Sequence, residues 1–210
     1  MFLENTLNFN KQSGWIEVVC GSMFSGKTEE LIRRIRRAEF ANLSVIIFKP
    51  RVDVRDEKNK VVSHDQSKIN CLTVKCAKDI LKEVSDHKVV GVDEAQFFDD
   101  EIVKVCNELA NRGVRVIVAG LDMDYKGVPF STMANLMATA EYVTKVHAIC
   151  PKTGGLAQYS YRKAKSKKRI LLGKKTEYMP LSRTAYAVSY THLRAHETKA
   201  KLVCRLLLEK

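Results

Sequence analysis

Apolar and polar positions along this chain fall into blocks with two different periods. Short continuous apolar runs have the length of buried strands, and they cover residues 15–20, 44–48, 88–92, 114–119 and 142–149. Amphipathic stretches with apolar side chains at helical spacing alternate with these runs, and they cover residues 28–40, 77–85, 100–111 and 132–140. Strands that alternate with helices of this length predict an α/β fold with a parallel sheet flanked by helices.

Two regions interrupt the alternation. Residues 51–70 are polar and predict a long loop, of the kind that usually serves a function. From Cys150 onward the composition shifts to Gly, Lys, Ser and Tyr, with a possible hairpin at 169–179. The expected organisation is a lead-in (1–14), a nucleotide-binding domain (15–149), a small C-terminal lobe (150–188) and a tail (189–210).

The first apolar run leads into a glycine-hinged motif. Its residues fit the pattern G-x-x-x-x-G-K-[ST], and they are Gly21, Ser22, Met23, Phe24, Ser25, Gly26, Lys27 and Thr28. A strand before the motif and a helix after it are the context in which backbone N–H groups wrap phosphates. In such a loop Lys27 can reach the terminal phosphates, and the Thr28 hydroxyl can bind Mg²⁺. The motif predicts a nucleoside triphosphate site.

A second apolar run ends in acidic residues. The strand at 88–92 is followed by Asp93, Glu94, Ala95 and Gln96, all four of which we expect to contact the nucleotide. Ligands in open α/β sheets bind at the carboxyl ends of the strands. We therefore expect Asp93 to hold Mg²⁺ opposite Thr28, and Glu94 to accept a proton from an attacking hydroxyl or water.

Charge raises a competing interpretation. The 210 residues carry a formal net charge of +12, which is compatible with nucleic-acid binding. Two basic clusters contribute much of this charge, Arg33–Arg37 on the first helix and the run 162–169. Neither cluster contains interleaved aromatic residues for base stacking, so we favour a solvated helix face and an exposed loop, and expect no nucleic-acid partner.

The remaining composition favours a cytoplasmic protein. No run approaches the roughly 20 apolar residues of a membrane helix, and the N-terminus lacks the pattern of a signal peptide. The six cysteines are scattered without a C-x-x-C pair, so a disulfide framework is not expected.

Aromatic residues at strand ends and in loops indicate what accepts the phosphate. Phe97, Phe98, Tyr125 and Phe130 occupy such positions, where flat faces would suit a planar base. They could equally fill the junction between the domain and the lobe. A nucleic-acid-dependent ATPase would need a motor coupling region, for which 210 residues leave little room.

Several of these motifs together closely resemble type II thymidine kinases. The resemblance runs from about Trp15 to Tyr186 and rests on residues 21–28, 49–55, 63–65, 92–98 and 120–130. It implies transfer of the γ-phosphate of ATP to the 5′-hydroxyl of thymidine, with deoxyuridine as a further possible acceptor. It also implies a homotetramer.

The resemblance assigns roles residue by residue. It implies that Glu94 is the general base, that Lys27 and Arg55 stabilise the transferring phosphoryl group, and that Asp53 supports the site. It places the nucleoside pocket at Met23, Phe97, Leu121, Tyr125, Phe130, Ser160 and Tyr178. In this family the C-terminal lobe closes over the base.

The small lobe departs from the family pattern. The family holds a structural zinc with two C-x-x-C (or C-x-x-H) pairs. Here those pairs are Cys150–Thr153 and Ser182–Ala185, so only Cys150 could supply a thiolate. Because structural zinc needs four such ligands, we expect a degenerate zinc-ribbon-like lobe without zinc.

The tail after about residue 188 has no counterpart in the family. It resembles translated sequencing-adaptor read-through, so we leave it out of the functional argument. Three hypotheses follow from the sequence: a thymidine kinase, a P-loop ATPase acting with nucleic acid, and an inactive nucleotide-binding relative. The presence of Lys27, Thr28, Asp93 and Glu94 favours the first over the third.

Overall fold

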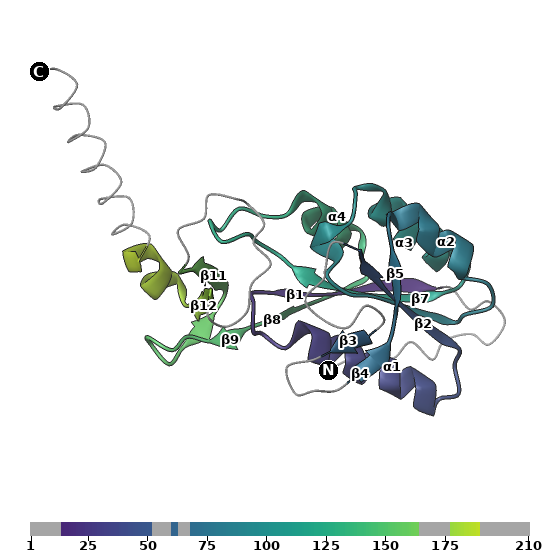
Figure 1. The fold of residues 1–210 in the computed structure, drawn as a ribbon, viewed down its shortest axis with the longest axis horizontal. Helices are drawn as coiled ribbons and strands as arrows, with labels where there is room; N and C mark the ends of the chain where they lie inside the picture. The colour runs from purple at the N-terminus through teal and green to yellow at the C-terminus, as the bar shows by residue number, and fades with distance from the viewer. Residues whose placement is uncertain (1–13, 52–59, 63–67, 164–176, 190–210) are drawn as a thin grey trace, which may run out of the picture.

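A parallel sheet forms the centre of the molecule (Figure 1). The computed structural model describes residues 14–51, 60–62, 68–163 and 177–189. The strands, in the order in which they lie side by side, are β5 (Leu72–Val74), β2 (Val45–Pro50), β6 (Val89–Val92), β7 (Arg115–Leu121), β1 (Trp15–Gly21) and β8 (Tyr142–Val146). Each neighbouring pair is parallel, so the predicted fold class is confirmed.

Helices cover both faces of this sheet (Figure 1). They are α1 (Lys27–Phe40), α2 (Ala77–Glu83), α3 (Glu101–Asn111) and α4 (Ser131–Thr139). One apolar cluster joins the sheet to α2, α3 and α4, and a second joins the opposite face to α1. Alternate residues of one strand divide between them: Val18 belongs to the first cluster and Val19 to the second, as the period of a strand requires.

The polar stretch 51–70 differs in part from the predicted loop. It contains two short antiparallel strands, β3 (Lys60–Val62) and β4 (Lys68–Asn70). The next strand, β5, adds to the edge of the main sheet beside β2 and was not predicted. Its three residues are too few to show a hydrophobic period.

One residue of the basic helix cluster contradicts the prediction of a solvated face. Arg34 is only 4% exposed, and its Nη1 donates to Glu17 Oε2 at 2.8 Å. Glu17 is fully buried in β1 and also accepts bonds from Arg115 Nε and Trp15 Nε1, each at 2.7 Å. A buried charge must be paired to be tolerated, so this arginine is structural, whereas Arg33 in the same cluster is exposed.

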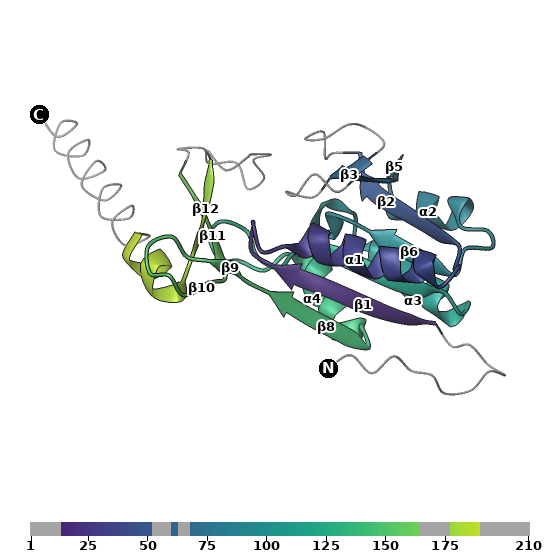
Figure 2. The ribbon, with the colours of Figure 1, turned by 90° about the horizontal axis from the view of Figure 1, so that it is seen from below.

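The small lobe lies beyond the carboxyl end of β1 (Figure 2). It contains two strand pairs and a helical segment over residues 183–189. The strands are β9 (Ala148–Ile149), β10 (Leu156–Ala157), β11 (Tyr159–Arg162) and β12 (Tyr178–Leu181). The hairpin expected at 169–179 falls mostly outside the described residues, and the observed pairing joins Arg162 to Tyr178.

The lobe has its own small core. Its buried members are Ala148, Cys150, Ala157, Leu181, Ala185 and Tyr186. Leu156 is 65% exposed, whereas Leu181 is fully buried. Among the described residues, no helix is long and apolar enough to cross a membrane.

Candidate active site

The phosphate loop joins β1 to α1 with a backbone that requires glycine at both ends. Gly21 has a φ of 153°, and a Cβ atom there would lie 2.1 Å from the carbonyl oxygen of Val146. Gly26 has a φ of 84° and precedes the first residue of α1. Positive φ values of this kind are accessible to glycine without a steric penalty. A glycine-hinged loop that leads into a helix N-terminus is the arrangement that suits an anion.

Lys27 is held inside this loop. Its Nζ donates to the carbonyl oxygen of Ser22 at 2.7 Å. Burial lowers the pKa of the Lys27 ammonium, and the negative charges of Glu94, Asp93 and Asp122 act against that shift. The cation therefore lies among carboxylates at the carboxyl edge of the sheet, where it can turn toward a phosphate.

Thr28 and Asp93 face each other across the same edge. The Thr28 hydroxyl lies 3.5 and 3.4 Å from the two carboxylate oxygens of Asp93. Asp93 is 8% exposed and accepts a hydrogen bond from the backbone of Glu94 at 3.0 Å. One hydroxyl and one carboxylate are the protein ligands of Mg²⁺ in P-loop proteins, so these residues fit the ion.

Glu94 has an unusual backbone. Its φ of 53° and ψ of 41° are left-handed, and it precedes the 3₁₀ turn η1 (Ala95–Phe97). Its Oε2 accepts a hydrogen bond from Gln96 Nε2 at 2.5 Å, while Gln96 Oε1 accepts from the backbone N–H of Leu121 at 2.9 Å. Such conformations are costly and concentrate at functional sites. Gln96 thus orients the carboxylate of Glu94.

The predicted nucleoside-pocket residues come from both parts of the chain. Ser160 on β11 accepts a hydrogen bond from the backbone N–H of Met23 in the phosphate loop at 2.9 Å. Tyr125, in the loop after β7, and Tyr178 on β12 both contact Arg162. Ser160 is only 5% exposed, and its hydrogen bond with Met23 links the lobe to the phosphate loop.

The aromatic residues predicted near the nucleoside divide between core and half-buried positions. Phe98 and Phe130 belong to the large apolar cluster, with Leu121 packed at its border. Phe97 is half-buried at the end of η1. Core packing thus accounts for part of this set. Two further predicted residues, Asp53 and Arg55, lie outside the described residues.

The zinc positions form a hydrogen-bonded cluster in the lobe. Cys150 has no exposed surface, and the Thr153 and Ser182 hydroxyls lie 3.1 Å apart. Burial raises the pKa of the Cys150 thiol, but hydrogen bonds from Thr153, Ser182 and the Lys152 backbone outweigh it and lower the pKa to about 6. Two hydroxyls, one thiol and the methyl of Ala185 do not make a four-ligand zinc site. These residues do not fit the metal.

The sequence analysis did not predict roles for three residues near the site, which are Asp122, Lys145 and Arg162. Asp122, at the end of β7, is 3% exposed, and its Oδ2 lies 2.8 Å from Lys145 Nζ on β8. A hydrogen bond with this carboxylate raises the pKa of Lys145. Arg162, expected in an exposed loop, is 5% exposed. The position of Asp122 directly after a strand could have indicated a site residue. Nothing in the basic run 162–169 distinguishes Arg162 from its neighbours.

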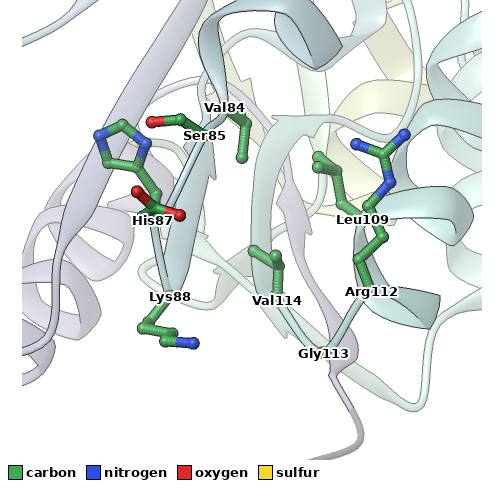
Figure 3. Close-up of a pocket in the computed structure, with 9 residues that line it drawn as sticks. Val84, Ser85, His87, Lys88, Leu109, Arg112, Gly113 and Val114 are labelled. Carbon is green, nitrogen blue, oxygen red and sulfur yellow. The ribbon is translucent and has the colours of Figure 1, made fainter.

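A pocket of about 120 Å³ lies elsewhere, at the amino ends of β6 and β7 (Figure 3). Val84, Leu109 and Val114 point into it, and Lys88 and Arg112 lie at its border. It is at the opposite edge of the sheet from the phosphate loop. It holds neither the loop nor Glu94, so it is not the reaction site.

A parallel sheet with a phosphate loop after β1 and an acidic strand end at β6 defines a P-loop nucleotide-binding protein. The family model described as thymidine kinase matches residues 14–186. This chain belongs to the thymidine kinase family.

Curated relatives agree with that assignment. A thymidine kinase of Bacteroides fragilis is 54% identical over 186 residues, which are 89% of this chain and 94% of the relative. One of Porphyromonas gingivalis is 50% identical over 88% of this chain and 90% of the relative. One of Rhodothermus sp. is 53% identical over 82% and 81%. Among solved structures, the genome packaging NTPase B204 of Sulfolobus turreted icosahedral virus 2 matches 68% of this chain and 79% of its own, at 17% identity and a TM-score of 0.41.

Proposed function

We propose that this chain transfers the γ-phosphate of ATP to the 5′-hydroxyl of thymidine, giving thymidine monophosphate and ADP. Membership of the thymidine kinase family supports the substrate class. The intact phosphate loop and the carboxylates after β6 support catalysis rather than nucleotide binding alone. Acceptance of deoxyuridine and assembly as a homotetramer belong to the same proposal, on the family resemblance alone.

The observation that carries the proposal is the placement of Glu94. Glu94 follows Asp93 directly, the hydrogen bond from Gln96 holds its carboxylate, and its charge acts on Lys27 of the phosphate loop. In this proposal Glu94 accepts the proton of the 5′-hydroxyl as that oxygen attacks the γ-phosphorus. A base so held needs little rearrangement to act.

The other residues neutralise charge. Phosphoryl transfer depends on positioning and electrostatic stabilisation more than on covalent chemistry. Lys27 leaves the carbonyl of Ser22 and pairs with the phosphates, and Arg55 adds a second positive charge. Thr28 and Asp93 would hold Mg²⁺, which supplies charge neutralisation on the phosphates. Asp53 supports the site, and the lobe over residues 150–188 closes on the nucleoside.

Replacement of the base tests the proposal. Glu94→Gln should lower kcat with thymidine by about 10²–10⁴-fold and leave ATP affinity within about twofold, because the substitution keeps the shape of the side chain. Glu101→Gln changes a partly exposed carboxylate of α3 and should leave kcat unchanged. Unchanged turnover in the Glu94 variant would rule out the base.

The acceptor is tested in the same assay. ATP turnover is measured with thymidine, deoxyuridine, deoxycytidine, single-stranded DNA, and no acceptor. Turnover that rises with thymidine supports the proposal. Turnover that rises only with DNA would replace it with a nucleic-acid-dependent ATPase, and no turnover with any acceptor would indicate an inactive relative.

A further inference from the structure

Arg162 occupies an unexpected environment for the first member of a basic run. It is the last residue of β11 and pairs with Tyr178 across the β11–β12 ladder. Its side chain is 5% exposed, whereas the next residue, Lys163, is exposed. Burying a guanidinium group is unfavourable unless its donors and its charge are satisfied. The contacts of Arg162 should therefore show what it does.

Those contacts join the two parts of the molecule. Nε and Nη2 of Arg162 donate to the Tyr178 hydroxyl at 3.1 and 2.7 Å. The guanidinium carbon also lies 3.7 Å from the ring centroid of Tyr125, in the loop that follows β7. Tyr178 belongs to the lobe and Tyr125 to the main domain. One planar cation therefore binds the hydroxyl of one tyrosine and covers the ring of the other.

Arginine is well suited to this double role. Its rigid fork directs several N–H groups at one acceptor, and its flat face stacks on aromatic rings. A desolvated cation over a ring contributes more than an exposed one. A lysine would keep the charge but offer neither the fork nor the flat face.

We propose that Arg162 is a positioning residue of the nucleoside site, which fixes the Tyr125 ring and the Tyr178 hydroxyl in their relative places. The inference rests on the proposed function, because the family resemblance places both tyrosines in the nucleoside pocket. Arg162 acts through them. Preorganising two side chains lowers the cost of ordering them when the ligand binds.

Because ATP is bound by the phosphate loop, loss of Arg162 should affect the two substrates differently. Arg162→Lys should raise KM for thymidine by about tenfold or more, since losing an interaction of this strength corresponds to at least a decade of affinity. KM for ATP should remain within about twofold. A general loss of lobe structure would instead affect the stability of the chain and both constants.

The lobe offers a matched control. Arg183 lies 5.4 Å from the ring centroid of Tyr159, is exposed, and has no proposed place in the nucleoside pocket. Arg183→Lys makes the same chemical change at another arginine–tyrosine pair and should leave KM for thymidine unchanged.

The test therefore measures both KM values for the wild type, Arg162→Lys, Arg183→Lys, Tyr178→Phe and the Arg162→Lys/Tyr178→Phe double variant. Tyr178→Phe should reproduce part of the rise in KM for thymidine, and the double variant should add less than the product of the single effects, because the two residues share one interaction. An unchanged KM for thymidine in Arg162→Lys, or an equal rise in both KM values, would overturn the positioning role while leaving the proposed function intact. A wild type that does not phosphorylate thymidine would overturn the proposed function itself, and the positioning role with it.

Discussion

The phosphate half of the site and the small lobe are built by different means. The phosphate loop, Asp93 and Glu94 follow directly from the ends of β1 and β6, so the hydrogen bonds of the sheet fix their places. The lobe has two short strand pairs and is joined to the main domain by side chains such as Ser160 and Tyr186. The sheet backbone fixes the residues proposed to bind phosphate and Mg²⁺, whereas individual side chains hold the lobe proposed to close on the nucleoside.

The two halves also differ in how much change their residues can tolerate. Around Cys150, hydrogen bonds occupy the positions at which the family resemblance implies zinc ligands. The phosphate loop has no such freedom, because any side chain at Gly21 would collide with the Val146 carbonyl. Three predictions test the contrast, in order of the effect expected.

The largest effect on stability should come from the main domain. Arg34→Ala removes one of the cations that pair with fully buried Glu17, and breaking a buried pair costs about 3 kcal/mol or more. Urea unfolding measures the loss. Arg33→Ala is the control, because Arg33 also bonds Glu30 but is exposed, and it should cost at most about 1 kcal/mol. Equal losses in the two variants would show that the buried pair is not what secures α1.

The same arginine shows where sequence reasoning reached its limit. Strand and helix positions followed from hydrophobic period, and the phosphate loop and Asp93-Glu94 followed from motifs placed at strand ends. Period does not reveal which member of a run of arginines is buried, because Arg33 and Arg34 differ only in direction around the helix. Glu17 within an apolar run was the available signal, since a carboxylate inside a strand requires a buried cation.

The lobe was predicted less well for a related reason. Its strands are two to four residues long, too short to show alternation. Its core uses Ala148, Cys150 and Ala157, which are not conspicuous apolar residues. Arg162 and Ser160 act through contacts with residues far away in the sequence, and no local pattern encodes such contacts. The family resemblance assigned Ser160 to the nucleoside pocket, and it gave no sign that the hydroxyl binds the phosphate loop.

The second prediction concerns the pH dependence of the lobe. The pKa of Cys150 is lowered to about 6, against about 8.5 for an unfolded thiol. The folded state therefore holds the proton less tightly, and the stabilisation is fully present above about pH 8.5 and is lost as the pH falls through about 6. The Tm difference between wild type and Cys150→Ser should therefore shrink as the pH is lowered from about 8.5 to about 6.

A second cysteine provides the control for that experiment. Burial raises the pKa of Cys106 to about 12, so this thiol stays protonated in both folded and unfolded states below about pH 8. The Tm difference between wild type and Cys106→Ala should therefore be constant from pH 6 to 8. It should be larger than the difference for Cys150→Ser, because α3 loses a core contact. A constant difference for Cys150→Ser as well would show that no thiolate forms in the lobe.

The smallest effect, expected to be zero, comes from chelation. If hydrogen bonds take the place of zinc, treatment with a chelator such as EDTA should leave Tm unchanged. After the chelator is removed and Mg²⁺ is restored, KM for thymidine should also be unchanged. Elemental analysis should find no zinc in proportion to protein. A structural zinc site normally contributes strongly to folding, so removal of the zinc would lower Tm. One zinc per chain, or a fall in Tm on chelation, would mean that other residues complete the site around Cys150. The lobe would then be held by a metal, and its contrast with the phosphate half would rest on the short strands alone.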